Sequence, residues 1–304
     1  MIIEAAGISV RFGSARILES VDFSVDKGET VGIVGESGSG KTTLARTLLG
    51  LIPHFEGTIR TKAFGNLRRE TAMMFQDPVG SLSPRLSVGS LITEPFVIHG
   101  EPMTSRRAKA EELLALVGLT ADFARRYPHE LSGGQARRVG VARALALKPK
   151  LVIADEPTAG LDVSIQGEIL NLMTSLKRKF DLAYVIVTHN LAVIRHVSDR
   201  LVIMYLGRVV EEGPTREVFA NPAHPYSASL IASEPVPDPR RRRANLAITG
   251  EVPSILARPK GCEFHTRCPR VAERCRIDAP PLSDLGSRRK VRCHFPLQQG
   301  GRKT

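Results

Sequence analysis

The segment from Gly35 to Thr42 constrains this chain more than any other, because it reads GESGSGKT and fits the pattern G-x-x-x-x-G-K-[ST]. An apolar run at residues 30–34 precedes it and predicts a strand, and residues 43–49 after it have a helical pattern. Glycines let backbone N–H groups turn toward phosphate oxygens, and a helix N-terminus adds partial positive charge. The order strand, loop, helix therefore predicts a site for a nucleoside triphosphate.

Within this loop, Lys41 is expected to reach the β- and γ-phosphates, and Thr42 is expected to hold Mg²⁺. A stretch rich in glycine and serine can also be only a flexible turn, but the flanking strand and helix favour the phosphate site. The predicted nucleotide-binding residues of the segment are Gly35, Ser37, Gly38, Ser39, Gly40, Lys41, Thr42 and Thr43.

A second pattern places two carboxylates after an apolar run, since residues 151–154 read LVIA and are followed by Asp155 and Glu156. We expect Asp155 to be a Mg²⁺ ligand and Glu156 to act as general base on the attacking water. Gln76, which would sense Mg²⁺ and the water, and His189, which would hydrogen-bond the γ-phosphate, fit the same site. The alternative is a strand that merely ends in polar residues.

A third pattern, LSGGQ at residues 131–135, opens a helix predicted to run to residue 147. Ser132 offers a hydroxyl, Gly133 and Gly134 offer unobstructed N–H groups, and Gln135 follows them at the helix N-terminus. The chain thus carries two candidate phosphate-binding segments, of which only one has a lysine. Two chains that face each other would use both segments, although Ser-Gly-Gly also occurs as an ordinary cap.

The alternation of strand-like and helix-like segments predicts an α/β fold with a largely buried sheet. Residues 84–148 have mainly helical character, including an amphipathic segment at 106–117. We expect an ATPase domain over residues 1–235 and a small cysteine-rich C-terminal extension over residues 236–304. The strands are expected at residues 2–5, 21–25, 30–34, 150–154, 183–188 and 201–205.

The net charge of +12 and the sequence pI near 10.0 are compatible with a nucleic acid, an anionic membrane surface or an acidic subunit as partner. Four tyrosines, no tryptophan and no alternation of basic and aromatic residues argue against specific nucleic-acid binding. The run from Arg240 to Arg243 lies among prolines and is expected to be a solvated linker. No transmembrane run or signal peptide is evident, so a cytoplasmic location is expected.

All four cysteines lie at or after residue 262, and a cytoplasmic chain is not expected to pair them as disulfides. Five, six and seventeen residues separate neighbouring cysteines, which is wider than the close knuckles of zinc sites. A [4Fe–4S] cluster fits the number of thiols. Zinc, with help from His265 or His294, and unliganded cysteines remain alternatives. The four candidate ligands are Cys262, Cys268, Cys275 and Cys293.

Taken in order, these motifs resemble those of the ATP-binding subunit of an ABC transporter, over residues 1–235. The resemblance rests on residues 35–42, 131–135, 155–156 and 159–162, together with Gln76 and His189. It implies a P-loop NTPase fold with a helical subdomain over residues 84–148. It also implies that Phe12 stacks on adenine, that Gln76 lies in the loop that contacts a membrane subunit, and that Asp162 couples two sites. Ser132 and Gly134 would bind the γ-phosphate in the partner chain's site.

Residues 82–85, 161–166, 221–226, 250–254 and 261–269 resemble the ATPases of dipeptide, oligopeptide and nickel importers. That resemblance implies an ATP-hydrolysing, energy-coupling subunit with a [4Fe–4S] cluster, peripheral on the cytoplasmic face of the cell membrane. Its partners would be a second ATPase subunit, in an unlike pair, two transmembrane permeases and an extracytoplasmic solute-binding protein. Peptides are the favoured cargo and nickel the alternative. Two other classes remain open, a soluble ABC-type factor acting on ribosomes or DNA and a metal or redox sensor in which ATP is regulatory.

Overall fold

The structure is a computed structural model and describes residues 1–61, 63–234 and 250–297. The chain divides into two compact units, each built from several chain segments. The first unit contains Met1–Ile2, Val25–Glu29 and Thr61–Val187, and the second contains Ile3–Ser24, Thr30–Arg60 and Thr188–Thr304. The basic run from Arg240 to Arg243 lies outside the described residues.

In the first unit, three parallel strands lie in the order β7 (Ala183–Val187), β6 (Leu151–Asp155) and β5 (Thr71–Met74). Every residue of β6 and β7 is buried, which explains why both strands read as continuous apolar runs. The helix α6 (Val163–Phe180) connects them. The strands expected at residues 150–154 and 183–188 are confirmed to within one residue, whereas β5 was not predicted.

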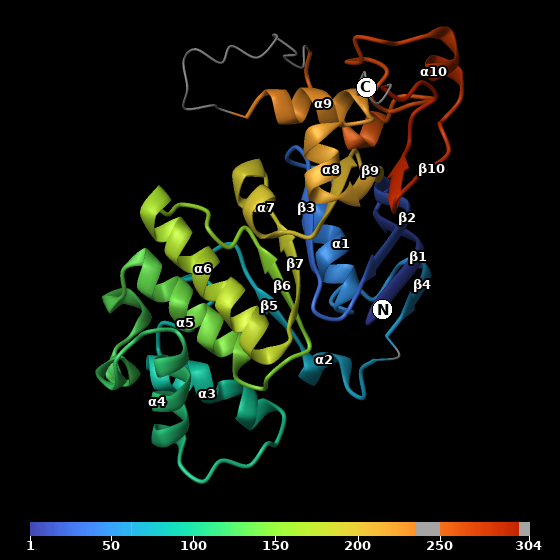
Figure 1. The fold of residues 1–304 in the computed structure, drawn as a ribbon. Coiled ribbons are helices and arrows are strands. Elements are labelled where there is room, and N and C mark those ends of the chain that lie inside the picture. Colours follow the sequence, from blue (N-terminus) through green and yellow to red (C-terminus); the bar gives the residue numbers. More distant parts are fainter. Residues whose placement is uncertain (62, 235–249, 298–304) are drawn as a thin grey trace. The chain divides into compact units, whose positions relative to one another are not determined.

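The residues of this unit between β5 and β6 form helices and their connections. Three of them, α3 (Val88–Ile98), α4 (Arg106–Leu116) and α5 (Gly133–Leu145), lie against one another (Figure 1). The expected amphipathic helix is confirmed as α4, which begins after the N-cap Ser105 and buries Ala110, Leu113 and Leu114. The short elements α2 (Leu67–Glu70), η1 (Ala121–Arg125) and η2 (Pro128–Glu130) complete the unit.

In the second unit, a three-stranded sheet has the order β2 (Ala15–Val25), β1 (Ile3–Phe12) and β4 (Glu56–Arg60). The strands expected at residues 2–5 and 21–25 are therefore parts of longer elements. Other strands of this unit lie in the order β10 (Ser283–Gly286), β11 (Arg289–Val291), β9 (Arg208–Pro214), β8 (Arg200–Tyr205) and β3 (Thr30–Val34).

The C-terminal segment, by which we mean the described residues 250–297, is joined to the rest of this second unit through backbone pairing. β11 pairs antiparallel with β9, β9 with β8, and β8 runs parallel to β3, the strand that leads into the phosphate loop. The helices of the unit are α1 (Lys41–Leu48), α7 (Leu191–Val197), α8 (Thr215–Ala220), α9 (Pro225–Ala232), η3 (Ile255–Ala257) and α10 (Glu273–Ile277). Across the described ranges, no helix has both the length and the apolar composition needed to cross a bilayer.

Candidate functional site

The predicted phosphate loop lies between β3 and α1, as the sequence pattern indicates. Gly35, Gly38 and Gly40 all have positive φ, of 155°, 78° and 96°. A Cβ atom at Gly35 would lie 2.2 Å from the carbonyl oxygen of Met204, so no side chain fits there. The helix begins at Lys41, earlier than residue 43, so Thr42 and Thr43 lie in its first turn.

Lys41 holds the loop in a tight curve. Its Nζ donates hydrogen bonds of 2.8 Å to the carbonyl oxygens of Gly35 and Glu36, and one of 3.3 Å to Ser39 Oγ. The ammonium charge therefore lies at the loop itself, where an anionic phosphate group would be bound. Ser37 and Gly38 at the tip of the loop are exposed, while Ser39 is buried.

Two further residues with predicted roles belong to this same unit. Phe12 ends β1 and is 54% exposed, which leaves an aromatic ring available for stacking. His189 is also exposed, and the residue before it, Thr188, donates its N–H to Ile33 of β3 over 3.1 Å. The second unit thus contains the phosphate loop, Phe12 and His189.

The two acidic residues are in the first unit, at the carboxyl end of β6. Asp155 is buried, and Glu156 follows it with a φ of +49°. The Glu156 N–H donates to the Val187 carbonyl over 2.8 Å, which holds this left-handed backbone in place. A non-glycine residue in that region costs roughly 1 kcal/mol or more, and such strain concentrates at functional sites.

Ser132 caps α5, which confirms that the LSGGQ segment opens a helix. Ser132 Oγ accepts a hydrogen bond of 3.3 Å from the Gln135 N–H, and Gln135 Oε1 accepts one of 3.0 Å from the Ser132 N–H. This reciprocal pair is a capping box. The serine side chain is exposed at the helix N-terminus.

The LSGGQ segment lies beside the turn that contains Asp162. A Cβ atom at Gly133 would lie 3.3 Å from Leu161 Cδ2, and one at Gly134 would lie 3.0 Å from Ile165 Cγ2. Asp162 caps α6 by accepting the Ile165 N–H over 2.9 Å, and both Asp162 and Gly133 are exposed. Val163, the next residue, is 85% exposed, so this surface of the unit carries polar caps beside an apolar side chain.

Arg137 is a residue of this region that no sequence motif marks. It is buried, and its guanidinium donates to the carbonyl oxygens of Phe75 (3.1 Å), Gln76 (2.7 Å) and Ala159 (3.1 Å). Burial lowers the pKa of Arg137, and the nearby Asp77 and Glu156 oppose that shift. Arg137 therefore joins the backbone at Gln76 to the backbone at Ala159, shortly before Asp162. The Gln76 side chain itself is exposed.

The four cysteines line one small pocket in the second unit, with room for about one water-sized sphere. Burial raises the pKa of Cys262 to about 12 and also raises the pKa values of Cys268 and Cys293. Within the described ranges, no three or more His, Cys, Asp or Glu side chains are arranged to hold a metal ion. His265 Nδ1 lies 2.9 Å from the Cys262 carbonyl oxygen, and His294 Nε2 lies 2.9 Å from that of Asp278, so both rings face backbone groups.

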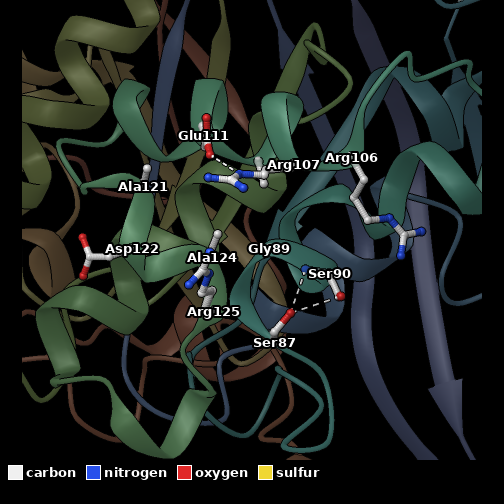
Figure 2. Close-up of a pocket in the computed structure, with 11 residues that line it drawn as sticks. Ser87, Gly89, Ser90, Arg106, Arg107, Glu111, Ala121, Asp122, Ala124 and Arg125 are labelled. Atoms are coloured by element: carbon white, nitrogen blue, oxygen red, sulfur yellow. Dashed lines mark hydrogen bonds and ion pairs between the residues drawn. The ribbon is translucent and has the colours of Figure 1, made fainter.

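A larger cavity, of about 560 Å³, lies in the first unit among α3, α4 and η1 (Figure 2). Two internal contacts occupy part of its polar lining: Arg107 Nε donates to Glu111 over 2.9 Å, and Ser87 and Ser90 hydroxyls are 3.2 Å apart. None of the residues predicted to bind nucleotide is among its lining residues. This cavity is therefore separate from the predicted phosphate chemistry.

Two family matches cover most of the chain. Residues 18–159 match the family described as ABC transporter, and residues 210–275 match the one described as oligopeptide/dipeptide transporter, C-terminal region. The probable peptide ABC transporter ATP-binding protein y4tS of Sinorhizobium fredii is 46% identical, over 96% of this chain and 86% of its own. The oligopeptide transport ATP-binding protein AppF of Bacillus subtilis is also 46% identical, over 94% of this chain and 91% of its own.

Solved structures agree with these matches. The protein cbiO1 of Clostridium perfringens, part of the ABC transporter complex cbiONQ, has a TM-score of 0.65 and 28% identity over 72% of this chain and 90% of its own. The ATP-binding cassette MJ0796, in a dimeric post-hydrolysis state bound to ADP and Pi, has a TM-score of 0.62 and 30% identity over 70% of this chain and 99% of its own. The loop, the capped helix, the strand-end carboxylates and these likenesses lead to one conclusion: the chain belongs to the ATP-binding proteins of the ABC transporter family.

Proposed function

We propose that this chain is the ATP-hydrolysing, energy-coupling subunit of a membrane importer for di- and oligopeptides. The observation that carries the proposal is the match of residues 210–275 to the oligopeptide/dipeptide transporter C-terminal region, in a chain that also has a complete phosphate loop. The named function of relatives such as the di/tripeptide transport ATP-binding protein DppF of Pseudomonas aeruginosa, 42% identical, supports the peptide cargo. Nickel is the alternative cargo within the same group of importers.

The roles proposed for individual residues follow the chemistry of phosphoryl transfer. Lys41 and the loop N–H groups would bind and stabilise the charge of the phosphates, while Thr42, Asp155 and Gln76 would hold Mg²⁺, which supplies charge neutralisation. Glu156 would accept the proton of the attacking water and His189 would hydrogen-bond the γ-phosphate. Phe12 would stack on the adenine. The support for these assignments is the strained backbone at Glu156, the buried position of Asp155 and the contacts of Lys41 with its loop.

We further propose that two such subunits, as an unlike pair, enclose the nucleotides between them. The exposed Ser132 cap, Gly133, Gly134 and Gln135 would close on the partner's γ-phosphate, and the exposed Asp162 beside them would couple the two sites. The dimeric, ADP- and Pi-bound state of a relative supports this arrangement. Residues 1–235 would form the ATPase domain and residues 236–304 an extension. The pair would sit on the cytoplasmic face of the membrane, with two permeases and an extracytoplasmic binding protein as further partners.

The test is reconstitution of the whole assembly, with both permeases and the binding protein, into liposomes. We expect uptake of a labelled tripeptide that requires ATP, and ATP hydrolysis that the tripeptide stimulates. A Lys41→Ala variant of the same assembly is the control, because it removes the ammonium group from the phosphate loop and should abolish both hydrolysis and uptake. Stimulation by Ni²⁺ instead of peptide would overturn the cargo, and salt-sensitive RNA binding without any uptake would overturn the importer.

We also propose that the four cysteines bind a [4Fe–4S] cluster. The support is the donor set, since all four thiols line one pocket, and metal binding would favour the thiolate forms of Cys262, Cys268 and Cys293 against the burial that raises their pKa values. The pocket walls would have to move apart, because the pocket has room for only about one water-sized sphere. Anaerobically purified protein should contain iron and sulfide and absorb visible light, and Cys268→Ser should lose that absorbance. Stoichiometric zinc without iron would refute the cluster.

A further inference from the structure

The C-terminal segment contacts the phosphate loop directly. Glu36 is the second residue of that loop, and Arg267 lies 231 positions further along the chain. The two Nη atoms of Arg267 donate to the two carboxylate oxygens of Glu36 over 2.6 Å and 2.9 Å. The Arg267 side chain is only 5% exposed and that of Glu36 25%, so this two-pronged ion pair is largely shielded from water.

A cluster of aromatic residues holds this contact in position. The Tyr226 hydroxyl accepts a hydrogen bond of 3.0 Å from the Glu36 N–H. The Tyr205 hydroxyl accepts one of 3.4 Å from Arg267. The rings of Tyr205, Tyr226 and Phe264 are mutually packed, with centroid separations of 4.8, 5.3 and 5.4 Å. All three rings are buried, so Arg267 is presented to the loop from a rigid support.

The charge arrangement explains what such a contact does. Glu36 places a carboxylate on the very loop that must bind an anionic triphosphate, and two anions in one site repel each other. The guanidinium of Arg267 neutralises the charge of that carboxylate and holds it in the ion pair. It also fixes a glycine-rich segment that would otherwise lose conformational freedom when the nucleotide binds.

We propose that Arg267 is a positioning residue for nucleotide binding. By holding Glu36, it lets the C-terminal segment fix the conformation of the phosphate loop before the nucleotide binds. The proposal rests on the assignment of the phosphate loop as the ATP site and is independent of the transported cargo. It gives the C-terminal segment a part in the ATPase site, in addition to whatever its cysteines bind.

The test compares the affinity of the purified assembly for a fluorescent ATP analogue in three variants. Arg267→Met keeps an unbranched apolar side chain but removes the charge and the hydrogen-bond donors, and we expect about tenfold weaker binding, the size of one lost charge-assisted contact. Glu36→Gln removes the repelling charge, so the double variant Arg267→Met/Glu36→Gln should bind more tightly than Arg267→Met alone. Arg267→Lys, which keeps the charge without the two-pronged geometry, should be intermediate.

Arg289→Met is the matched control. Arg289 is another buried arginine of the C-terminal segment, and it donates to Glu211 over 3.1 Å and to the Asn221 carbonyl over 2.6 Å, away from the loop. The Arg289→Met variant should have a lower midpoint of thermal unfolding and an unchanged affinity for the ATP analogue. Arg267→Lys covers the case in which Arg267→Met does not fold. Unchanged affinity in a folded Arg267 variant, or no recovery in the double variant, would overturn the proposal.

Discussion

The hydroxyl of Tyr226 accepts a hydrogen bond of 3.0 Å from the backbone N–H of Glu36, although 190 positions separate the two residues. Tyr226 is fully buried in α9, and burial raises the pKa of its phenol, so the hydroxyl stays neutral at physiological pH. The path of the phosphate loop therefore depends on an element far along the chain as well as on the loop's own glycines.

Tyr226→Phe tests this hydrogen bond, because it removes one oxygen and leaves the packed ring. We expect a loss of about 1 kcal/mol in the free energy of unfolding, since a part-buried N–H loses its acceptor. Binding of an ATP analogue should weaken at the same time. Tyr184→Phe, which removes a buried phenol oxygen in the other unit, is the control and should leave nucleotide affinity as it is. Chemical denaturation and fluorescence titration measure both effects.

Glu156→Gln should abolish turnover while ATP binding persists, because the amide keeps the shape of the side chain but cannot accept the proton of water. A drop in kcat of at least about a hundredfold is expected for loss of a general base. With ATP present, the variant should also accumulate as a closed pair of subunits, seen as a larger species in size-exclusion chromatography. Steady-state hydrolysis at the original rate would remove Glu156 from its assigned role.

Arg137→Met should lower kcat more than it changes KM, because the lost side chain ties the backbone at Gln76 to that at Ala159. The buried guanidinium loses three hydrogen bonds to carbonyl oxygens together, so a loss of about 2 kcal/mol or more in stability is also expected. Arg138→Met is a matched control on the next residue, since Arg138 pairs with the exposed Glu168 over 2.8 Å. Equal kinetic defects in the two variants would show that Arg137 has no special role.

Glu70→Gln should make stability less dependent on pH. The hydrogen bond from Lys150 lowers the pKa of the Glu70 carboxyl below its unfolded value, with further bonds from the N–H groups of Gly65 and Asn66. That contribution, about 1 kcal/mol, is complete above the unfolded pKa near 4.3 and is lost as pH falls through the lower folded pKa. The difference in urea stability between the two proteins should therefore be present at pH 7 and shrink below about pH 4.

Gly207→Ala should destabilise the support of the phosphate loop. Gly207 has a φ of +77°, its N–H donates to the Ser39 carbonyl over 3.0 Å, and a Cβ there would lie 2.1 Å from the Ile17 carbonyl oxygen. We expect a loss of at least about 2 kcal/mol. Gly167→Ala is the opposite case, since Gly167 is inside α6 with nothing within 4 Å of an added Cβ. It should stabilise the protein by roughly 0.5–1 kcal/mol in thermal unfolding.

Expectations that rest on short stretches of chain agree with the structure. The strand at residues 30–34, the glycine loop and the Ser132 cap all depend on contacts within a few residues, so their patterns are complete in the sequence. β5 was missed because it is only four residues long and three of these residues are only half-buried. β1 and β2 were predicted too short, because their exposed positions interrupt the apolar pattern.

The sequence by itself determined the phosphate chemistry, because a lysine, a hydroxyl and correctly spaced glycines carry their function in local backbone geometry. Only the tertiary structure decided which arginines matter. Arg137 and Arg138 are neighbours of the same residue type, yet Arg137 is buried and donates only to carbonyl groups, whereas Arg138 is half-buried and pairs with the exposed Glu168 as well as with the Val117 carbonyl. Arg267 likewise becomes a partner of Glu36 only because strand pairing and aromatic packing bring residues 231 positions apart into contact. Partners of long side chains are set by topology, which short-range patterns do not contain.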